Sequence, residues 1–174
     1  MTDPSFTVPE PERQARIAEP FAGDGVTPGS SLFDPRRPAA FESGGNGLMS
    51  TAPDYAQFLL MLRNGGQLDG KRYLGDATLK QMTSDQLGPQ VVRTPLYLPG
   101  AGNGFGLGFA VRTDVGRNPL PGTPGDYYWG GAYGTYFWHD PKERLFVVYM
   151  MQSPVARLRY RYLMRDLVYQ AMVN

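Results

Sequence analysis

The sequence contains no cysteine and only one histidine, His139. The absence of cysteine excludes disulfides, thiolate metal ligands and a cysteine nucleophile, and a single histidine excludes a multi-histidine metal centre. We therefore expect neither a metal site nor a cofactor. His139 stands directly before Asp140-Pro141, a dipeptide typical of turns, so a solvated or loop-bonded role is expected for it rather than catalysis.

An excess of one charge and a long apolar run are also missing. The 17 Lys and Arg residues nearly balance the 16 Asp and Glu residues, which leaves a formal net charge of +1. Nothing therefore indicates a nucleic-acid partner or an acidic membrane surface. No apolar run approaches the roughly 20 residues that span a membrane. The N-terminus shows no basic region followed by an apolar run, so no signal peptide is visible.

The residues that are present are typical of one ordinary globular domain. A length of 174 residues is enough for a real core. The 22 glycines and 16 prolines imply many turns and loops. Residues 1–48 carry several of these prolines and should be irregular, apart from a short helix within 10–18.

A longer helix is predicted to begin after residue 51. Thr51 is a suitable N-cap, with Pro53 in the first turn and Asp54 as the acidic partner of a capping box. The apolar residues that follow recur with helical spacing, at Tyr55, Phe58, Leu59 and Leu62. The Asn-Gly-Gly sequence at 64–66 should end this helix, and residues 76–85 should form a second, shorter one.

The hydrophobic period changes from 3.6 to 2 at Gly104. Residues 104–111 alternate glycine or alanine with bulky residues, which predicts a strand with one nearly bare face, open to a helix or a ligand. A second strand is expected within 126–143. The continuously apolar run 145–151 is typical of a central strand covered on both faces.

The final helix is expected to start with Ser153 as its N-cap and Pro154 at its first position. Two rows of residues run along it. The apolar row should form the buried stripe and consists of Tyr160, Leu163, Met164, Leu167, Val168 and Ala171. The other row consists of Arg157, Arg161 and Arg165. It could bind an anion, but we expect these arginines to be solvated, or to pack the aliphatic parts of their side chains over apolar surface.

The stretch 126–143 is rich in aromatic residues, contains both tryptophans and carries Gly130, Gly131 and Gly134. Glycines among aromatic rings fit a binding wall with exposed backbone N–H groups, because the missing Cβ lets another group approach closely. A glycine-bulged strand with aromatic cross-strand partners explains the same pattern. Taken alone, the stretch favours this second interpretation.

Several stretches resemble, in order along the chain, motifs of the serine β-lactamase and penicillin-binding protein superfamily. The resemblance is greatest to its class C β-lactamase-like esterases, the family VIII carboxylesterases. The stretches are residues 1–9 (MTDPSFTVP), 44–51 (GGNGLMST) followed by Asp54 and Tyr55, 64–70 (NGGQLDG), 104–109 (GFGLGF) and 129–131 (WGG). Together they extend over nearly the whole chain.

The resemblance implies an α+β fold of the β-lactamase/transpeptidase type. Residues 1–174 would be the C-terminal part of a single β-lactamase-like domain. Within it, 1–103 would be a loop and helical region, and 104–174 would hold antiparallel strands and the C-terminal helix. Three antiparallel strands are expected between residues 104 and 151, with the helices near 51 and 76 beside the sheet.

The resemblance also implies a site. Esterases of this family commonly carry Trp-Gly-Gly where β-lactamases have the Lys-Thr-Gly motif at the edge of the active site, and Trp129, Gly130 and Gly131 match that variant. The backbone N–H of Ala132 would then be one of two oxyanion-hole donors. Trp129 would line the substrate pocket, and the glycines would allow close substrate approach. Further pocket candidates are Tyr128 and Tyr133. Because Trp129 lacks the charge of the replaced lysine, neutral esters are favoured as substrates.

The motifs that would carry out the chemistry are absent. None of the seven serines has Lys three residues on, and none of the eleven tyrosines has Asn two residues on, so neither S-x-x-K nor Y-x-N exists. The family places both motifs N-terminal to the segment with which this chain begins. The sequence therefore predicts the C-terminal portion of a serine hydrolase that acts on an ester or β-lactam through an acyl-enzyme. It would be inactive without the N-terminal portion as its partner.

A hypothesis from another class competes with this one: a non-catalytic ligand-binding or partner module that kept the pocket wall and lost the chemistry. The DNA upstream of Met1 discriminates between them, since an in-frame S-x-x-K supports the hydrolase and a stop codon with its own ribosome site supports the module. The resemblance is to bacterial-type soluble proteins of the cytoplasm or periplasm. Without the N-terminal portion, Phe105, Phe109 and Phe146 should remain on an exposed apolar patch.

Overall fold

The centre of the protein is a five-stranded antiparallel sheet in the order β3-β4-β5-β6-β7. The computed structural model describes residues 1–24, 34–94 and 96–172. The strands are β3 (Asn103–Phe105), β4 (Ala110–Arg112), β5 (Tyr127–Gly130), β6 (Tyr136–Asp140) and β7 (Leu145–Tyr149). The predicted α+β class and antiparallel pairing are confirmed, but the sheet has more than the three strands expected.

The extra strands arise because the predicted strand 104–111 is broken in two. The N–H of Gly106 donates to the carbonyl oxygen of Phe109 at 2.8 Å, and Gly108 has a φ of +92°, so the chain turns here and β3 pairs with β4. The bare glycine face is occupied by protein. Asp85 lies against Gly104, and its Oδ1 accepts the N–H of Phe105 at 3.1 Å.

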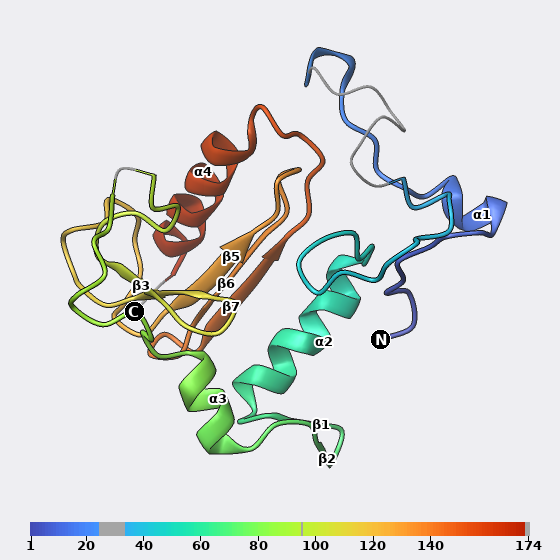
Figure 1. Ribbon diagram of the computed structural model, residues 1–174. Coiled ribbons are helices and arrows are strands. Elements are labelled where there is room, and N and C mark those ends of the chain that lie inside the picture. The colour runs from blue at the N-terminus through green and yellow to red at the C-terminus, as the bar shows by residue number, and fades with distance from the viewer. Residues whose placement is uncertain (25–33, 95, 173–174) are drawn as a thin grey trace.

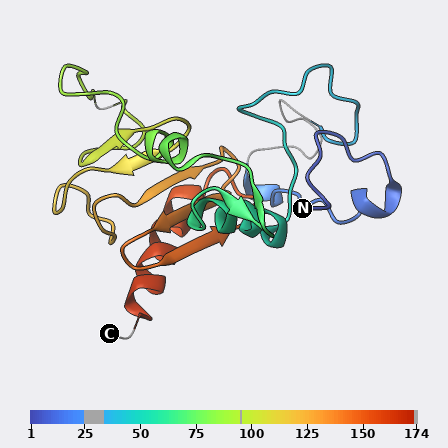
Figure 2. The same cartoon turned by 90° about the horizontal axis from the view of Figure 1, so that it is seen from below.

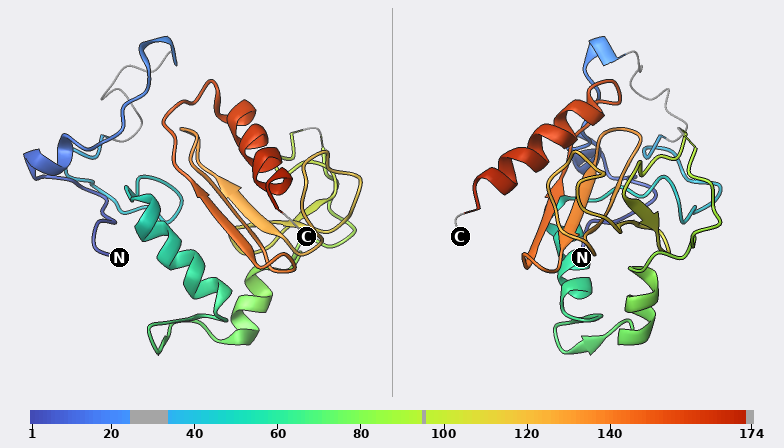
Figure 3. Two further views of the ribbon diagram at one scale, coloured as in Figure 1. Left: turned by 180° about the vertical axis from the view of Figure 1, so that it is seen from behind. Right: turned by 90° about the vertical axis from the view of Figure 1, so that its left-hand side faces the viewer.

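Helices cover the sheet on both sides. α2 (Ala52–Arg63) and α4 (Arg157–Gln170) lie on opposite faces, as Figure 1 and Figure 3 show. α3 (Asp76–Met82) follows a small hairpin of β1 (Gln67–Leu68) and β2 (Lys71–Arg72), and the N-terminal segment holds α1 (Pro11–Gln14) and the 3₁₀ turn η1 (Ala22–Asp24). Seen from below in Figure 2, this segment extends beyond the sheet next to α2.

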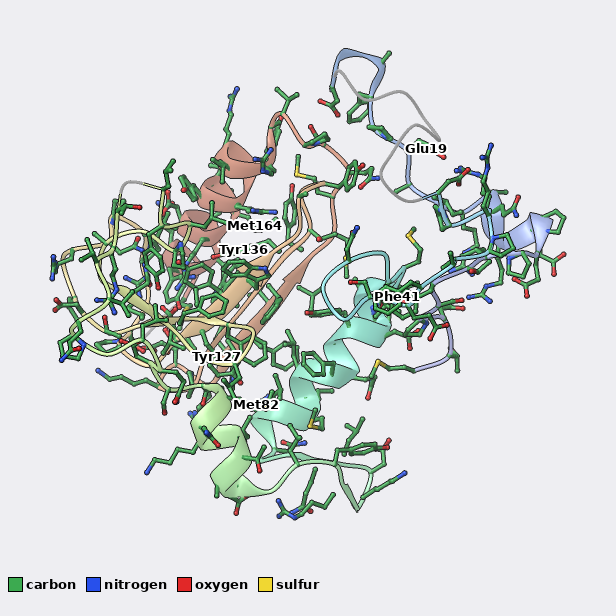
Figure 4. All side chains as sticks on the ribbon, viewed as in Figure 1. Glu19, Phe41, Met82, Tyr127, Tyr136 and Met164 are labelled. Carbon is green, nitrogen blue, oxygen red and sulfur yellow. The ribbon has the colours of Figure 1, made fainter. Side chains whose placement is uncertain are left out.

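The α2 face of the sheet holds the hydrophobic core. Leu59 and Leu62 of α2 pack against Phe109, Tyr127 and Phe137 of the sheet, and full burial of each such side chain contributes roughly 1.5–3 kcal/mol. Figure 4 shows Tyr127 at the side of the sheet toward α2 and α3. The predicted helix 52–63 is confirmed.

The N-cap of α2 is also confirmed, because the Thr51 side chain accepts the N–H of Asp54 at 3.3 Å. The reciprocal arm of the predicted capping box is not formed. The Asp54 carboxylate instead accepts the N–H groups of Thr2 and Asp3, so it fastens the N-terminal segment to the start of the helix.

The two rows of α4 face the opposite way from the prediction. Arg165 is fully buried and Arg161 is 9% exposed, whereas Leu163 and Leu167 of the apolar row are 45% and 51% exposed. The arginine row faces the sheet because this face offers partners for it. Arg165 donates to the Tyr136 hydroxyl at 3.0 Å, and Figure 4 places Tyr136 on the α4 side of the sheet.

A buried charged cluster holds α4 to the sheet. Asp126, fully buried, receives Arg165 Nη2 and Arg112 Nε on its Oδ2. Burial raises the pKa of Asp126 while the two arginines lower it, and the net direction is upward. The Arg165 guanidinium also lies 5.4 Å from the centre of the Trp138 ring. A buried carboxylate is tolerated only when it is paired in this way.

The start of α4 and the position of β7 also differ from the prediction. The Ser153 hydroxyl does not cap the helix, because it donates to Asp24 Oδ1 at 2.9 Å, and α4 begins at Arg157 instead. The apolar strand β7, expected to be central, is an edge strand among the described residues. All five of its residues are only half-buried.

The exposed apolar surface lies elsewhere than predicted. Phe109 is buried, and Phe105 and Phe146 are half-buried. The outer face of α4 is exposed instead, at Leu158, Tyr162, Leu163 and Leu167. A stripe of this kind on one helix is typical of a surface that another segment covers.

Replacing Arg165 by Met should lower the free energy of unfolding by about 3–5 kcal/mol, because it removes one partner of a buried ion pair. Urea unfolding followed by tryptophan fluorescence measures this change. The matched control is Arg159→Met, which removes the same charge from an exposed position of the same helix and should cost less than about 0.5 kcal/mol. Equal stability of the two variants would show that the buried cluster does not hold α4.

Candidate functional site

The bend between β5 and β6 offers a backbone donor. The N–H of Gly134 donates to the carbonyl oxygen of Gly131 at 3.1 Å, which makes residues 131–134 a turn with Ala132 at its second position. The N–H of this position takes no part in the hydrogen bond of a β-turn. No acceptor for the Ala132 N–H is found within the described ranges of the chain, and the residue is exposed. The bend therefore presents a free N–H to its surroundings.

The space beside the two glycines before Ala132 is occupied by other side chains of the protein. A Cβ on Gly130 would lie 2.5 Å from the guanidinium carbon of Arg161, and one on Gly131 would collide with the Thr135 hydroxyl. On the α4 side of the sheet, the space beside Gly130 that the sequence suggested for a substrate is thus filled by the Arg161 side chain.

Trp129 lies at the open edge of β5. β4 pairs with β5 only at Tyr127 and Tyr128, so beyond Tyr128 the outer edge of β5 has no strand partner among the described residues. The Trp129 ring is half-buried and packs edge-to-face on Phe105, with ring centres 5.1 Å apart. The open edge leads directly into the bend at Ala132.

The structure does not bring both tyrosine candidates to this edge. Tyr128 points to the α4 side of the sheet, opposite to Trp129, where its hydroxyl donates to the carbonyl oxygen of Pro99 at 3.0 Å. Burial raises the pKa of the Tyr128 hydroxyl well above its usual value. Tyr133 lies within the bend itself, and its carbonyl oxygen accepts the N–H of Ser153 at 2.7 Å.

A cavity of about 490 Å³ lies beside the bend and was not predicted from the sequence. It is lined by Phe21, Asp24, Tyr149, Met151, Gln152, Ser153, Ala156 and Tyr160. The sequence gives no local signal for it, because its walls come from segments 129 residues apart that meet at the Ser153–Asp24 hydrogen bond. Ser153 is buried, and its hydroxyl donates to the Asp24 carboxylate. Within the described residues it therefore lacks the amine or imidazole partner that typically activates a serine nucleophile.

The sequence suggested that His139 is solvated or bonded within a loop, and this prediction is wrong. His139 belongs to β6, is 5% exposed, and its Nδ1 lies 2.6 Å from the Tyr127 hydroxyl. Burial, together with the charge of Arg63, lowers the pKa of His139 to about 4. The ring is therefore a neutral part of the α2-side core, on the sheet face opposite to Ser153 and α4.

The bend offers one unpaired backbone N–H, and within the described residues no serine hydroxyl is hydrogen-bonded to a lysine or histidine side chain. Over the described parts of the chain, no group of three His, Asp or Glu side chains could hold a metal ion. None of the helices in these parts is both long enough and apolar enough to cross a membrane.

Comparison with known proteins identifies relatives over most of the chain. A family model described as Beta-lactamase matches residues 1–169. Two curated proteins of Mycobacterium tuberculosis are each 38% identical over 123 residues, namely Uncharacterized protein MT1414 of strain CDC 1551 / Oshkosh and Protein Rv1367c of strain ATCC 25618 / H37Rv. The match takes in 66% of this chain but only 30% of each relative.

Solved structures are also similar to this chain over most of its length. EstCE1, a hydrolase with promiscuous acyltransferase activity, is 31% identical with a TM-score of 0.66, covering 78% of this chain and 34% of its own. Simvastatin synthase (LovD) from Aspergillus terreus is 21% identical with a TM-score of 0.70, covering 100% of this chain and 47% of its own. A penicillin-binding protein homologue from Caulobacter crescentus is 22% identical with a TM-score of 0.54, covering 86% and 42%. The last two are similar in fold alone, and this chain spans less than half the length of all three.

Proposed function

The chain belongs to the beta-lactamase family, and we propose that it is the C-terminal portion of a serine hydrolase that acts on an ester or β-lactam through an acyl-enzyme. The observation that carries the proposal is the free N–H of Ala132 at the end of an open strand edge. Acyl transfer places negative charge on the carbonyl oxygen of the substrate, and a backbone N–H held in advance stabilises that charge without reorganisation. The second donor would be the N–H of the nucleophile in the N-terminal portion.

Trp129 forms the wall of the substrate pocket beside this donor. Its ring is half-buried against Phe105, so it offers an apolar surface and no charge. A neutral ester is therefore favoured over a substrate that carries a carboxylate. The relative EstCE1, a hydrolase, and the Trp-Gly-Gly sequence support assignment to the class C-like esterases.

Two surfaces support a partner portion of the same fold. The apolar strand β7 has no neighbour on its outer edge in the described structure, and the outer face of α4 exposes Leu163 and Leu167. A strand and a helix added there would complete the sheet and cover the stripe, as burial of apolar surface favours. Residues 1–174 would then be part of a single domain, with 1–103 beside the sheet and 104–174 providing the strands and α4.

The chain alone should not hydrolyse p-nitrophenyl esters or a chromogenic cephalosporin above the buffer rate. Adding a second chain that carries the N-terminal portion, with its S-x-x-K and Y-x-N motifs, should restore turnover, because only then are nucleophile, base and both oxyanion donors present. Replacing the serine of the added S-x-x-K by Ala is the control and should abolish it.

Turnover by the 174 residues alone, lost on mutating one of its own serines, would contradict the proposal. Tight association of the two chains without turnover would favour the alternative, a non-catalytic binding module.

Replacing Trp129 by Phe or Ala in the two-chain enzyme should change the preference among ester chain lengths more than it lowers kcat. The ring supplies shape rather than proton transfer, so its loss should mainly alter KM for substrates that fill the space it leaves. Steady-state kinetics on acetyl, butyryl and octanoyl esters measure this. A uniform loss of kcat on all three esters would contradict the pocket-wall role.

A further inference from the structure

Arg161 of α4 reaches under the bend that carries the proposed oxyanion donor. Its Nη2 donates to the carbonyl oxygens of both Gly131 and Thr135, the second at 2.9 Å. Its guanidinium occupies the space that Gly130 leaves empty and lies 5.6 Å from the centre of the Tyr136 ring. One side chain thus joins both ends of the bend to α4.

The charge of Arg161 is unusual because it is buried without a carboxylate. The residue is 9% exposed, and among the described residues no acidic group lies within ion-pair distance of it, in contrast to Arg165 of the same row. Burial lowers the pKa of Arg161. Its Nε is buried and finds no partner in the described part of the chain. Burial of an unpaired cation is costly in free energy. The negative ends of the Gly131 and Thr135 carbonyl dipoles offset part of this cost.

The contact with Gly131 acts directly on Ala132, because the two groups share one peptide unit. The carbonyl of Gly131 and the N–H of Ala132 lie in the same plane and point in opposite directions in a trans peptide, and no peptide bond here is cis. Holding the carbonyl oxygen toward α4 therefore fixes the N–H to point away from α4. A cation on the carbonyl oxygen also polarises the peptide and strengthens its N–H as a donor.

We propose that Arg161 is the positioning residue of the oxyanion hole: it orients and polarises the Gly131–Ala132 peptide so that the Ala132 N–H faces the reacting carbonyl. This proposal rests on the function proposed above. It also explains the glycine at position 130, since any side chain there would displace the guanidinium.

The geometry is tested on the 174-residue chain itself. In Arg161→Met, the amide signals of Ala132 and Gly134 in ¹H–¹⁵N spectra should shift, and the amide of Gly131, which bonds to Thr135, should exchange its hydrogen faster. Arg161→Lys keeps the charge but cannot bridge both carbonyls equally well. Its amide signals should therefore lie between those of the wild type and those of Arg161→Met. The control Arg159→Met, from an exposed position of α4, should leave these signals unchanged.

The catalytic consequence is tested in the two-chain enzyme. Arg161→Met should lower kcat for an ester by about 10-fold to 100-fold while KM changes by less than about threefold, because the lost stabilisation belongs to the transition state. Arg161→Lys should recover part of the loss, and Arg159→Met should match the wild type.

The proposal is overturned if Arg161→Met folds and its Ala132 signal and kcat coincide with those of Arg159→Met. Should Arg161→Met not fold, Arg161→Lys decides, and wild-type exchange at Gly131 together with a wild-type kcat overturns the proposal. Should the wild-type two-chain enzyme itself be inactive, the hydrolase function fails. In that case the amide signals alone decide whether Arg161 sets the bend, and unchanged signals overturn that role.

Discussion

The structure depends on two buried arginines, Arg161 and Arg165, that α4 presents to the sheet. Arg165 is balanced by Asp126 and holds the helix in place, while Arg161 is left to bind backbone carbonyls. Because arginines fill the inward face of α4, its leucines must face outward. The rotation of α4 about its axis thus places Arg161 against the bend. It also leaves an exposed apolar surface, which is typical of a surface that another segment of protein covers.

The rotation of α4 also brings Arg161 to the turn at residues 131–134, which carries the proposed donor. The hydrogen bond from Gly134 to Gly131 places Ala132 where its N–H is not needed for the turn, and Arg161 holds the peptide from the other side. Trp129 and the unpaired half of β5 directly precede this turn in the chain. In the proposed function this N–H would stabilise an oxyanion while the nucleophile comes from the N-terminal portion, which agrees with the absence of S-x-x-K from the sequence.

Local patterns could predict much of this. The N-cap at Thr51 and the helix after it follow from short-range spacing, and the change of hydrophobic period at Gly104 indicated strands. The order of the motifs identified the family, and the antiparallel pairing was expected from that resemblance. The rotation of α4 could not be predicted in this way. Its apolar row resembles any buried stripe, and the attraction of Arg165 to Asp126, which lies 39 residues earlier, has no local signal. The strand β7 was expected to be central because a continuously apolar sequence is typical of a strand covered on both faces. Such a sequence does not show which segment covers the strand.

The central claim is that the N–H of Ala132 stabilises the oxyanion for a nucleophile in the N-terminal portion. Proline is favoured at the second position of such a turn and has no N–H, so Ala132→Pro removes the donor while the bend is retained. Comparison of kcat for Ala132→Pro and Ala132→Gly in the two-chain enzyme is the most direct test. The account predicts a loss of about 10²–10³-fold for the proline variant and little loss for the glycine variant, which keeps the N–H. Equal kcat values for the two variants, with the bend intact, would contradict it.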